Sequence, residues 1–357
     1  MMTGYGEGRV VFDRYEEQSL KNKTRQKRAQ TSTDYKVHPQ MKLTMSIKEL
    51  LSSTTTKSHL TAIFAEGLLE HFVKRDNIKL VVVYGNKVKG FNFEEEHTHE
   101  EADTLIPYQV LSSLANGDSL DIYVWSPDTD VLTMLLHLVS TKRLDSQTRL
   151  KFLTGKAGKL REIDVVERVN AVGVSKCEGL IGLHNFTGAD WGGKFVGISK
   201  KTWVEAYMKL PEADPIVTCF RQLGSGFLSP QLIDDDLPPG VKDLEKFVCQ
   251  VYSSVGLMDI PALRWEMFQT RNMEGEMLPP TRAALLPHIA RANYATMRDK
   301  SYISAVIELI KCGCKKSCTK HCSCCKNAIP CTPLCKCYGM SCTNMKKDSV
   351  PDDEEGE

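Results

Sequence analysis

The chain has 357 residues, of which 41% are hydrophobic and 25% are charged, and its formal net charge is +1. This length and composition support a hydrophobic core in two domains, or in one large domain with an appendage. No apolar signal region opens the chain, and no run approaches the roughly 18 apolar residues of a membrane span, so we expect a soluble intracellular protein.

The first elements predict strand and helix in alternation. Residues 9–15 (RVVFDRY) predict a short strand that places Asp13 at its end. Residues 21–28 (KNKTRQKR) carry five basic residues and no acid, which is typical of a solvated basic face or a nuclear-localisation patch. Because this run lies close to Asp13 in the sequence, an alternative is that its lysines and arginines bind phosphates beside a metal site that includes Asp13. Residues 58–75 predict an amphipathic helix, and residues 78–85 a buried parallel strand.

The stretch from residue 98 to residue 130 carries two short acidic pairs. Thr98 and Glu101 fit a capping box for a helix that ends at the turn 116–117, and Asp103 completes the first pair. Residues 119–125 (SLDIYVW) alternate and predict a strand that ends at Ser126. Ser126 followed by Pro127 is typical of an N-cap and a first helical position, so we expect the second pair just past the carboxyl end of a buried strand.

The second pair consists of Asp128 and Asp130. Clustered carboxylates repel one another unless a cation neutralises them. Hard divalent ions such as Mg²⁺ or Mn²⁺ prefer oxygen ligands of this kind. The alternative is that these acids only cap helices and contact water, as most acidic side chains do.

The next segment continues the alternation. Residues 149–155 predict a strand, and residues 165–173 and 175–188 predict helices, so residues 9–188 predict a three-layer α/β domain with a parallel sheet. Asp190 follows in a glycine-bounded turn. Residues 197–201 (GISKK) then open a helix with Lys200 and Lys201 at its start, which is either a phosphate-binding turn or an ordinary helix start with exposed lysines.

The remaining candidates of this region have simpler interpretations. Residues 214–298 predict mostly helices, and we find no chemistry there. His97 and His99 could be metal ligands, but a polar loop before a helix cap explains them more simply. Cys177, Cys219 and Cys249 are expected to be thiols of the core.

Taken together, these motifs resemble the flap-endonuclease/PIN-like nucleases. Their residues are most similar to those of the mobile-element-associated branch of that family. The resemblance covers roughly residues 9–210. It implies a parallel α/β fold whose acidic pocket binds two divalent ions, Mg²⁺ or Mn²⁺, and cuts a phosphodiester. It assigns the catalytic and metal-binding roles to Asp13, Glu101, Asp103, Asp128, Asp130 and Asp190.

The resemblance also implies contacts with DNA. The GISKK segment, with Lys200 and Lys201, corresponds to the turn of the family's helix–two-turn–helix, which holds the duplex backbone. Lys21, Arg25 and Arg28 correspond to the family's cations that face the scissile phosphate. The family begins with a strand and a first metal-binding aspartate that precede the motifs found here. We therefore expect a weakened metal pocket, from a shortened gene or a retired enzyme.

The carboxyl end carries a dense cysteine cluster. Its spacing is C-x-C-x3-C-x3-C-x-C-x6-C-x3-C-x-C-x4-C, with Cys325 outside the pattern; the nine members are Cys312, Cys314, Cys318, Cys322, Cys324, Cys331, Cys335, Cys337 and Cys342. In an intracellular protein such a density indicates metal thiolates rather than disulfides. Nine thiolates can give three Zn²⁺ ions four ligands each if three sulfurs bridge.

The cluster and its lysines resemble the CXC (tesmin-type) zinc domain over residues 311–344, and known members of that family often bind DNA. Residues 311–347 contain eight lysines and no acidic residue, including Lys315, Lys316 and Lys320 as candidate DNA contacts. Part of this positive charge neutralises the thiolates. The acidic tail, residues 345–357, is expected to be disordered.

The sequence thus predicts a nuclease-type domain at residues 1–210, a mostly helical extension at 211–310, a zinc domain at 311–344 and an acidic tail. Two functions are compatible with it. One is a metal-dependent, structure-selective nuclease with a zinc DNA-binding module; the other is a non-catalytic DNA- or chromatin-binding protein derived from such a nuclease. Both imply DNA as the partner and the nucleus as the location.

Overall fold

The computed structural model describes residues 6–15, 33–73, 79–90, 92–97, 99, 102–115, 121–142, 144, 148–156, 158–189, 193–225, 239–271 and 274–302. The chain divides into two compact units, Met1–Asp299 and Lys300–Glu357, and every helix and strand named below belongs to the first. In these described ranges, no helix is both long enough and apolar enough to cross a bilayer.

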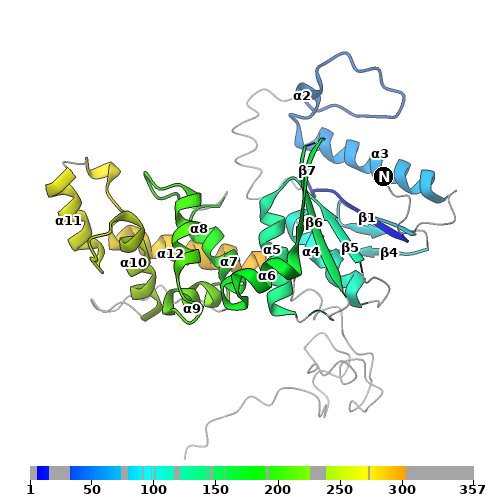
Figure 1. The fold of residues 1–357 in the computed structure, drawn as a ribbon. Helices are drawn as coiled ribbons and strands as arrows, with labels where there is room; N and C mark the ends of the chain where they lie inside the picture. Colours follow the sequence, from blue (N-terminus) through cyan, green and yellow to red (C-terminus); the bar gives the residue numbers. More distant parts are fainter. Residues whose placement is uncertain are drawn as a thin grey trace, which may run out of the picture. The chain divides into compact units, whose positions relative to one another are not determined.

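The described strands form two small mixed sheets (Figure 1). The first sheet has the order β1 (Glu7–Val11), β2 (Lys79–Tyr84), β3 (Lys87–Lys89) and β4 (Glu94–Glu96). The second has the order β5 (Asp121–Trp125), β6 (Arg149–Lys156) and β7 (Lys159–Asp164). Strand β1 is parallel to β2 and β5 is parallel to β6, whereas the remaining pairs are antiparallel. The protein is therefore an α/β protein, with antiparallel hairpins where the sequence predicted only parallel strands.

Apart from a short one at residues 47–50, the described helices of the first unit lie where the sequence predicted helical structure. They are α2 (Ile47–Leu50), α3 (Thr54–Val73), α4 (Ala102–Ala115), α5 (Thr129–Thr141), α6 (Val165–Val172), α7 (Val174–Phe186), α8 (Lys200–Lys209), α9 (Pro215–Gln222), α10 (Pro239–Tyr252), α11 (Ile260–Arg271) and α12 (Arg282–Asp299), with a 3₁₀ turn at Gly275–Met277. In residues 214–225, 239–271 and 274–298, which the structure describes, the predicted helical character is confirmed.

Strand β2 is buried on both faces, as its continuous apolar sequence predicted. Successive side chains of a strand point to opposite faces. Leu80, Val82 and Tyr84 accordingly pack with Ala65 and Leu69 of α3.

On the opposite face, Val81 and Val83 pack with Leu105 of α4. Helices α3 and α4 therefore cover the two faces of the first sheet, and α4 also contacts α5. This packing fixes the position of the start of α4 relative to the end of β1.

Helix α7 is the central element of the helical part, where it contacts α5, α9 and α12 (Figure 1). Its approach to α9 depends on Gly182, because a Cβ atom there would lie 2.3 Å from the backbone oxygen of Phe220. Aromatic side chains fill the adjacent core. The ring of fully buried Trp203 lies 4.7 Å from that of Phe195 and 5.5 Å from that of Phe247, measured between centroids.

The three cysteines outside the carboxyl-terminal cluster are buried thiols, which confirms the expectation that they belong to the core. Burial raises the pKa of Cys177, Cys219 and Cys249 to about 12 each. A raised thiol pKa means that the protonated, unreactive form persists at all pH values below it.

We expect these three thiols to resist alkylation by iodoacetamide at pH 8 in the folded chain and to react rapidly in denaturant. Mass-spectrometric mapping of alkylated peptides measures both rates. Rapid native labelling of Cys177 at pH 8 would contradict the buried placement of helix α7.

Candidate functional site

The turn between β5 and α5 holds the second acidic pair at the carboxyl end of a parallel strand. The Ser126 backbone N–H donates to the Leu153 carbonyl (3.1 Å), which ends the pairing with β6. The Ser126 hydroxyl accepts from the Asp128 N–H (3.1 Å), and Asp128 Oδ1 accepts from the Asp130 N–H (2.9 Å). The N-cap is therefore Asp128, and the prediction that Ser126 caps the helix is wrong. The cap moves two residues because the Asp128 carboxylate reaches the free N–H groups of the first turn.

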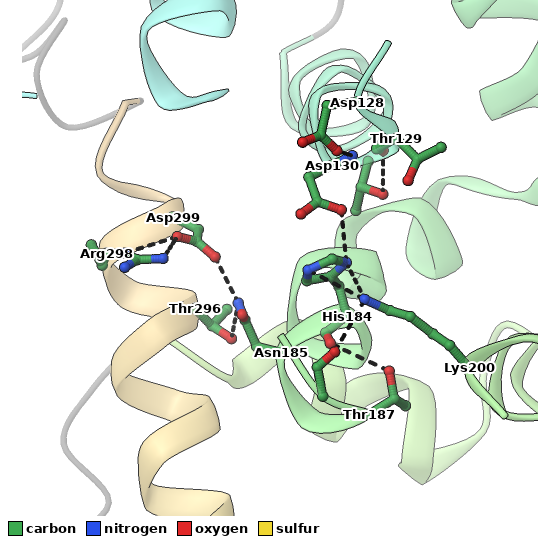
Figure 2. A network of polar contacts seen from close by, with 12 residues as sticks. Asp128, Thr129, Asp130, His184, Asn185, Thr187, Lys200, Thr296, Arg298 and Asp299 are labelled. Carbon is green, nitrogen blue, oxygen red and sulfur yellow. Dashed lines mark hydrogen bonds and ion pairs between the residues drawn. The ribbon is translucent and has the colours of Figure 1, made fainter. Parts of the chain in front are cut away.

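Asp130 faces His184 of α7, which also contacts Lys200 of α8 (Figure 2). Its Oδ1 lies 3.4 Å from Nδ1 of His184 on α7. The Lys200 ammonium, at the start of α8, lies 2.8 Å from that same nitrogen and 3.4 Å from the Gly188 carbonyl. Ser199 caps α8 and so sets the direction in which Lys200 leaves the helix. Three elements distant in the sequence thus place a cation beside an acidic pair.

The charge state of His184 follows from these neighbours. Burial lowers its pKa most, the Lys200 ammonium lowers it further, and the carboxylates of Asp130, Asp299 and Asp128 oppose this. A neutral imidazole can accept a hydrogen bond from the lysine, whereas an imidazolium cannot. Lys200 is therefore the cation that offsets the acidic pair, and His184 holds it in place.

Helix α12 contributes a further carboxylate that the sequence did not indicate. Asp299 is 6% exposed and accepts from the Asn185 amide (2.8 Å) and from Arg298 (2.7 Å) (Figure 2). The Asn185 amide also approaches the Thr296 hydroxyl (3.3 Å). No motif surrounds Asp299, and only the packing of α12 on α7 brings it near His184.

Asp13 lies at a different helix start. Its Oδ1 accepts from the Ala102 N–H (3.1 Å), so it caps α4 from outside and lies at the first turn, which carries Asp103. Asp13 and Arg14 also line an open pocket of about 300 Å³ at the carboxyl ends of β1 and β2, together with Tyr84 and Asn86.

Two histidines precede the same helix. The His97 backbone N–H donates to the Asn86 carbonyl (2.8 Å), and the His99 ring lies 5.3 Å from that of Tyr108. Burial lowers the pKa of both, that of His97 to about 4, with His99 and Arg14 adding to the effect. The segment precedes a helix, as predicted, and both residues are partly buried.

The structure therefore brings the predicted residues together in two groups. Asp13 lies at the start of α4 with Asp103, and Asp128 and Asp130 lie at the start of α5 with Lys200. Across the described ranges, no three His, Cys, Asp or Glu side chains form a group that could hold a metal ion. Lys201 is exposed and pairs with Glu205 at 3.7 Å.

Other predicted residues lie outside the described part of the chain. They are Glu101, Asp190, Lys21, Arg25, Arg28, Lys315, Lys316, Lys320 and the cysteine cluster. Their assignments stay predictions. At the start of α5, Asp128 and Asp130 both offer carboxylate oxygens, which are the type of ligand atom that a hard divalent ion prefers.

Asp164 provides a matched comparison for Asp128, because its Oδ1 caps α6 through the Glu167 N–H (2.9 Å). Replacing an N-cap Asp by Ala typically costs about 1 kcal/mol of folding free energy. We expect Asp128→Ala to cost less than Asp164→Ala when divalent ions are absent, because it also removes the repulsion with Asp130. Chemical denaturation measures both values, and an equal or larger cost at Asp128 would contradict a strained acidic pair.

Comparison with known proteins adds no family assignment: no protein-family model, no curated protein and no solved structure matches this chain.

Proposed function

We propose that the chain is a divalent-metal-dependent, structure-selective DNA nuclease of the flap-endonuclease/PIN-like type, with the three-layer parallel fold of that family and a carboxyl-terminal zinc module that binds DNA. The observation that carries the proposal is the acidic pair Asp128 and Asp130 at the end of a parallel strand, with the Lys200 ammonium beside it. Carboxylates and a lysine at one strand end are suited to a metal-bound phosphate.

Each residue of the proposed site has a role that follows from the chemistry of its side chain. Asp128 and Asp130 would hold a Mg²⁺ or Mn²⁺ ion, which supplies charge stabilisation to the phosphodiester and a more acidic bound water. Lys200 would donate to a phosphate oxygen once a metal ion replaces it as the counter-charge of Asp130. Neutral His184 keeps the ammonium within reach of both positions. Asp13 and Asp103 at the start of α4, with Glu101 and Asp190, would complete the carboxylate set.

A second function is favoured by the same geometry. The Lys200 ammonium contacts His184, which lies beside Asp130, and a side-chain cation there could take the place of a metal ion as a counter-charge. Such an arrangement is expected of a non-catalytic DNA- or chromatin-binding protein derived from a mobile-element nuclease. In either case the basic run at residues 21–28 and the lysine-rich cysteine segment fit a nuclear DNA-binding protein.

Cleavage of flapped and single-stranded DNA with Mg²⁺ or Mn²⁺ distinguishes the two functions. We expect the full chain to cut, and Asp128→Ala to lower the rate by roughly 10²-fold or more, as removal of a transition-state-stabilising group does. Lys200→Ala should also slow cleavage, because the phosphate loses a cation.

Asp164→Ala is the matched control, since it removes a helix cap of the same type away from the acidic pair. If the full chain and Asp128→Ala both fail to cut while the chain still binds DNA, the non-catalytic function holds. If Asp164→Ala loses as much activity as Asp128→Ala, the effect is one of stability and the assignment of Asp128 fails.

The cysteine cluster gives a separate prediction. We expect about three Zn²⁺ ions per chain, because nine thiolates satisfy three tetrahedral ions when three sulfurs bridge. Atomic emission on the purified chain measures the ratio, and Cys318→Ser combined with Cys337→Ser should lower it. Salt-dependent DNA binding that disappears with the zinc would support the module's role, and well under three ions would contradict the trinuclear site.

A further inference from the structure

The loop between β4 and α4 brings two imidazoles together. His97 and His99 are separated by one residue, and their ring centroids lie 6.3 Å apart. The main chain at His97 is fixed to the turn between β2 and β3 through the Asn86 carbonyl. At the other end, Ala102 is fixed by Asp13. The loop is thus held at both sides by the first sheet.

Three ring nitrogens of this pair are buried without a hydrogen-bond partner: both nitrogens of His97, and Nε2 of His99. A neutral imidazole has one N–H donor and one lone-pair acceptor, and buried side-chain polar atoms are nearly always paired. Two neighbouring exceptions at one place indicate that a ligand supplies the missing interactions.

The fourth ring nitrogen, Nδ1 of His99, has a partner, and this contact indicates which atom of His99 is available to bind a ligand. His99 Nδ1 lies 3.2 Å from the Thr104 hydroxyl, which is buried in the first turns of α4. When Nδ1–H donates to that oxygen, the Nε2 atom carries the lone pair. A second-shell hydrogen bond on the opposite ring nitrogen is the usual support of a metal-bound histidine, because it fixes both the tautomer and the ring orientation.

We propose that His97 and His99 bind a divalent ion of the zinc class through their ring nitrogens. Imidazole nitrogen suits Zn²⁺ and its first-row neighbours, unlike the oxygen set of the acidic pair, which suits Mg²⁺ or Mn²⁺. With metal–nitrogen bonds of about 2.0 Å and a tetrahedral angle, the centroids of two imidazoles on one ion lie roughly 5 Å apart, so the two rings would approach each other by about 1 Å on binding. Water molecules are suitable further ligands.

Arg14 is the unfavourable charge nearby, since its charge acts on His97. The preceding residue, Asp13, places a carboxylate at the start of α4. The bound ion would fix the loop against the first turns of α4. This proposal stands apart from the proposed nuclease function, because it uses neither Asp128, Asp130 nor the cysteine cluster.

Cobalt(II) is the probe, added to the full chain that holds three equivalents of zinc, which the cysteine thiolates take up in preference to a site of two imidazoles. We expect an additional Co²⁺ ion without sulfur-to-cobalt charge-transfer absorption, and paramagnetic shifts of two histidine signals in the NMR spectrum. The double variant His97→Gln/His99→Gln should lose this ion, whereas His59→Gln, which changes an exposed histidine of α3, should keep it. Circular dichroism verifies that the variants fold.

The acidic pair can also take Co²⁺, and Asp128→Ala separates the two sites. That variant should lose any cobalt held by carboxylates and keep the two shifted histidine signals. Absence of shifted histidine signals in the unaltered chain, or equal cobalt binding by the double variant and the unaltered chain, would overturn the histidine site. Neither result depends on whether the chain cuts DNA.

Discussion

Two carboxylates at the start of α5 require a neighbouring positive charge, and this requirement ties three helices together. Asp128 is committed to capping the helix, and Asp130 projects toward α7 and α8. The Asp130 side chain is partly exposed to water and Lys200 is exposed, and water screens their charges, so the lysine contributes only modestly to the local energy. Lys200 reaches that position from a helix start 70 residues further along the chain, and His184 on α7 holds it there.

The same network explains why α12 matters to a site that it does not directly form. Asp299 is almost fully buried, and its carboxylate is paired with Asn185, the residue next to His184 on α7. A buried carboxylate is stable only when such partners are present. Its charge acts on His184 together with those of Asp128 and Asp130. The helical part of the first unit therefore contributes to the electrostatics of the strand end, beyond its role in packing.

The start of α4 offers a different kind of donor from the start of α5. Asp13 and Asp103 bring carboxylates to the first turn, while His97 and His99 bring imidazoles to the loop that precedes it. Ligand softness separates the two classes of ion, so oxygen and nitrogen donors a few residues apart need not compete for the same metal. Thr104 and Ala102 connect the two through α4 itself.

Much of the secondary structure could be predicted because it depends on short-range rules. The apolar run of β2 and the helices α3, α6 and α7 follow from local sequence patterns. Strands β3, β4 and β7 were missed, because β4 consists of three exposed glutamates and β7 carries alternate charged residues that only pairing with a neighbour stabilises. The cap of α5 was misplaced by two residues because Ser126 and Asp128 are both good N-caps, and the local sequence does not rank them.

The sequence by itself determined the helices, the central strand β2, the buried thiols and the presence of two acidic pairs. Only the tertiary structure decided that the strands form two sheets, that Lys200 and His184 meet Asp130, and that Asp299 lies near them. It also decided that His97 and His99 are partly buried. The physical reason is the distance along the chain over which each effect acts. Periodicity and capping act within a few residues, whereas charge neutralisation and burial depend on side chains that folding brings together from distant parts of the chain.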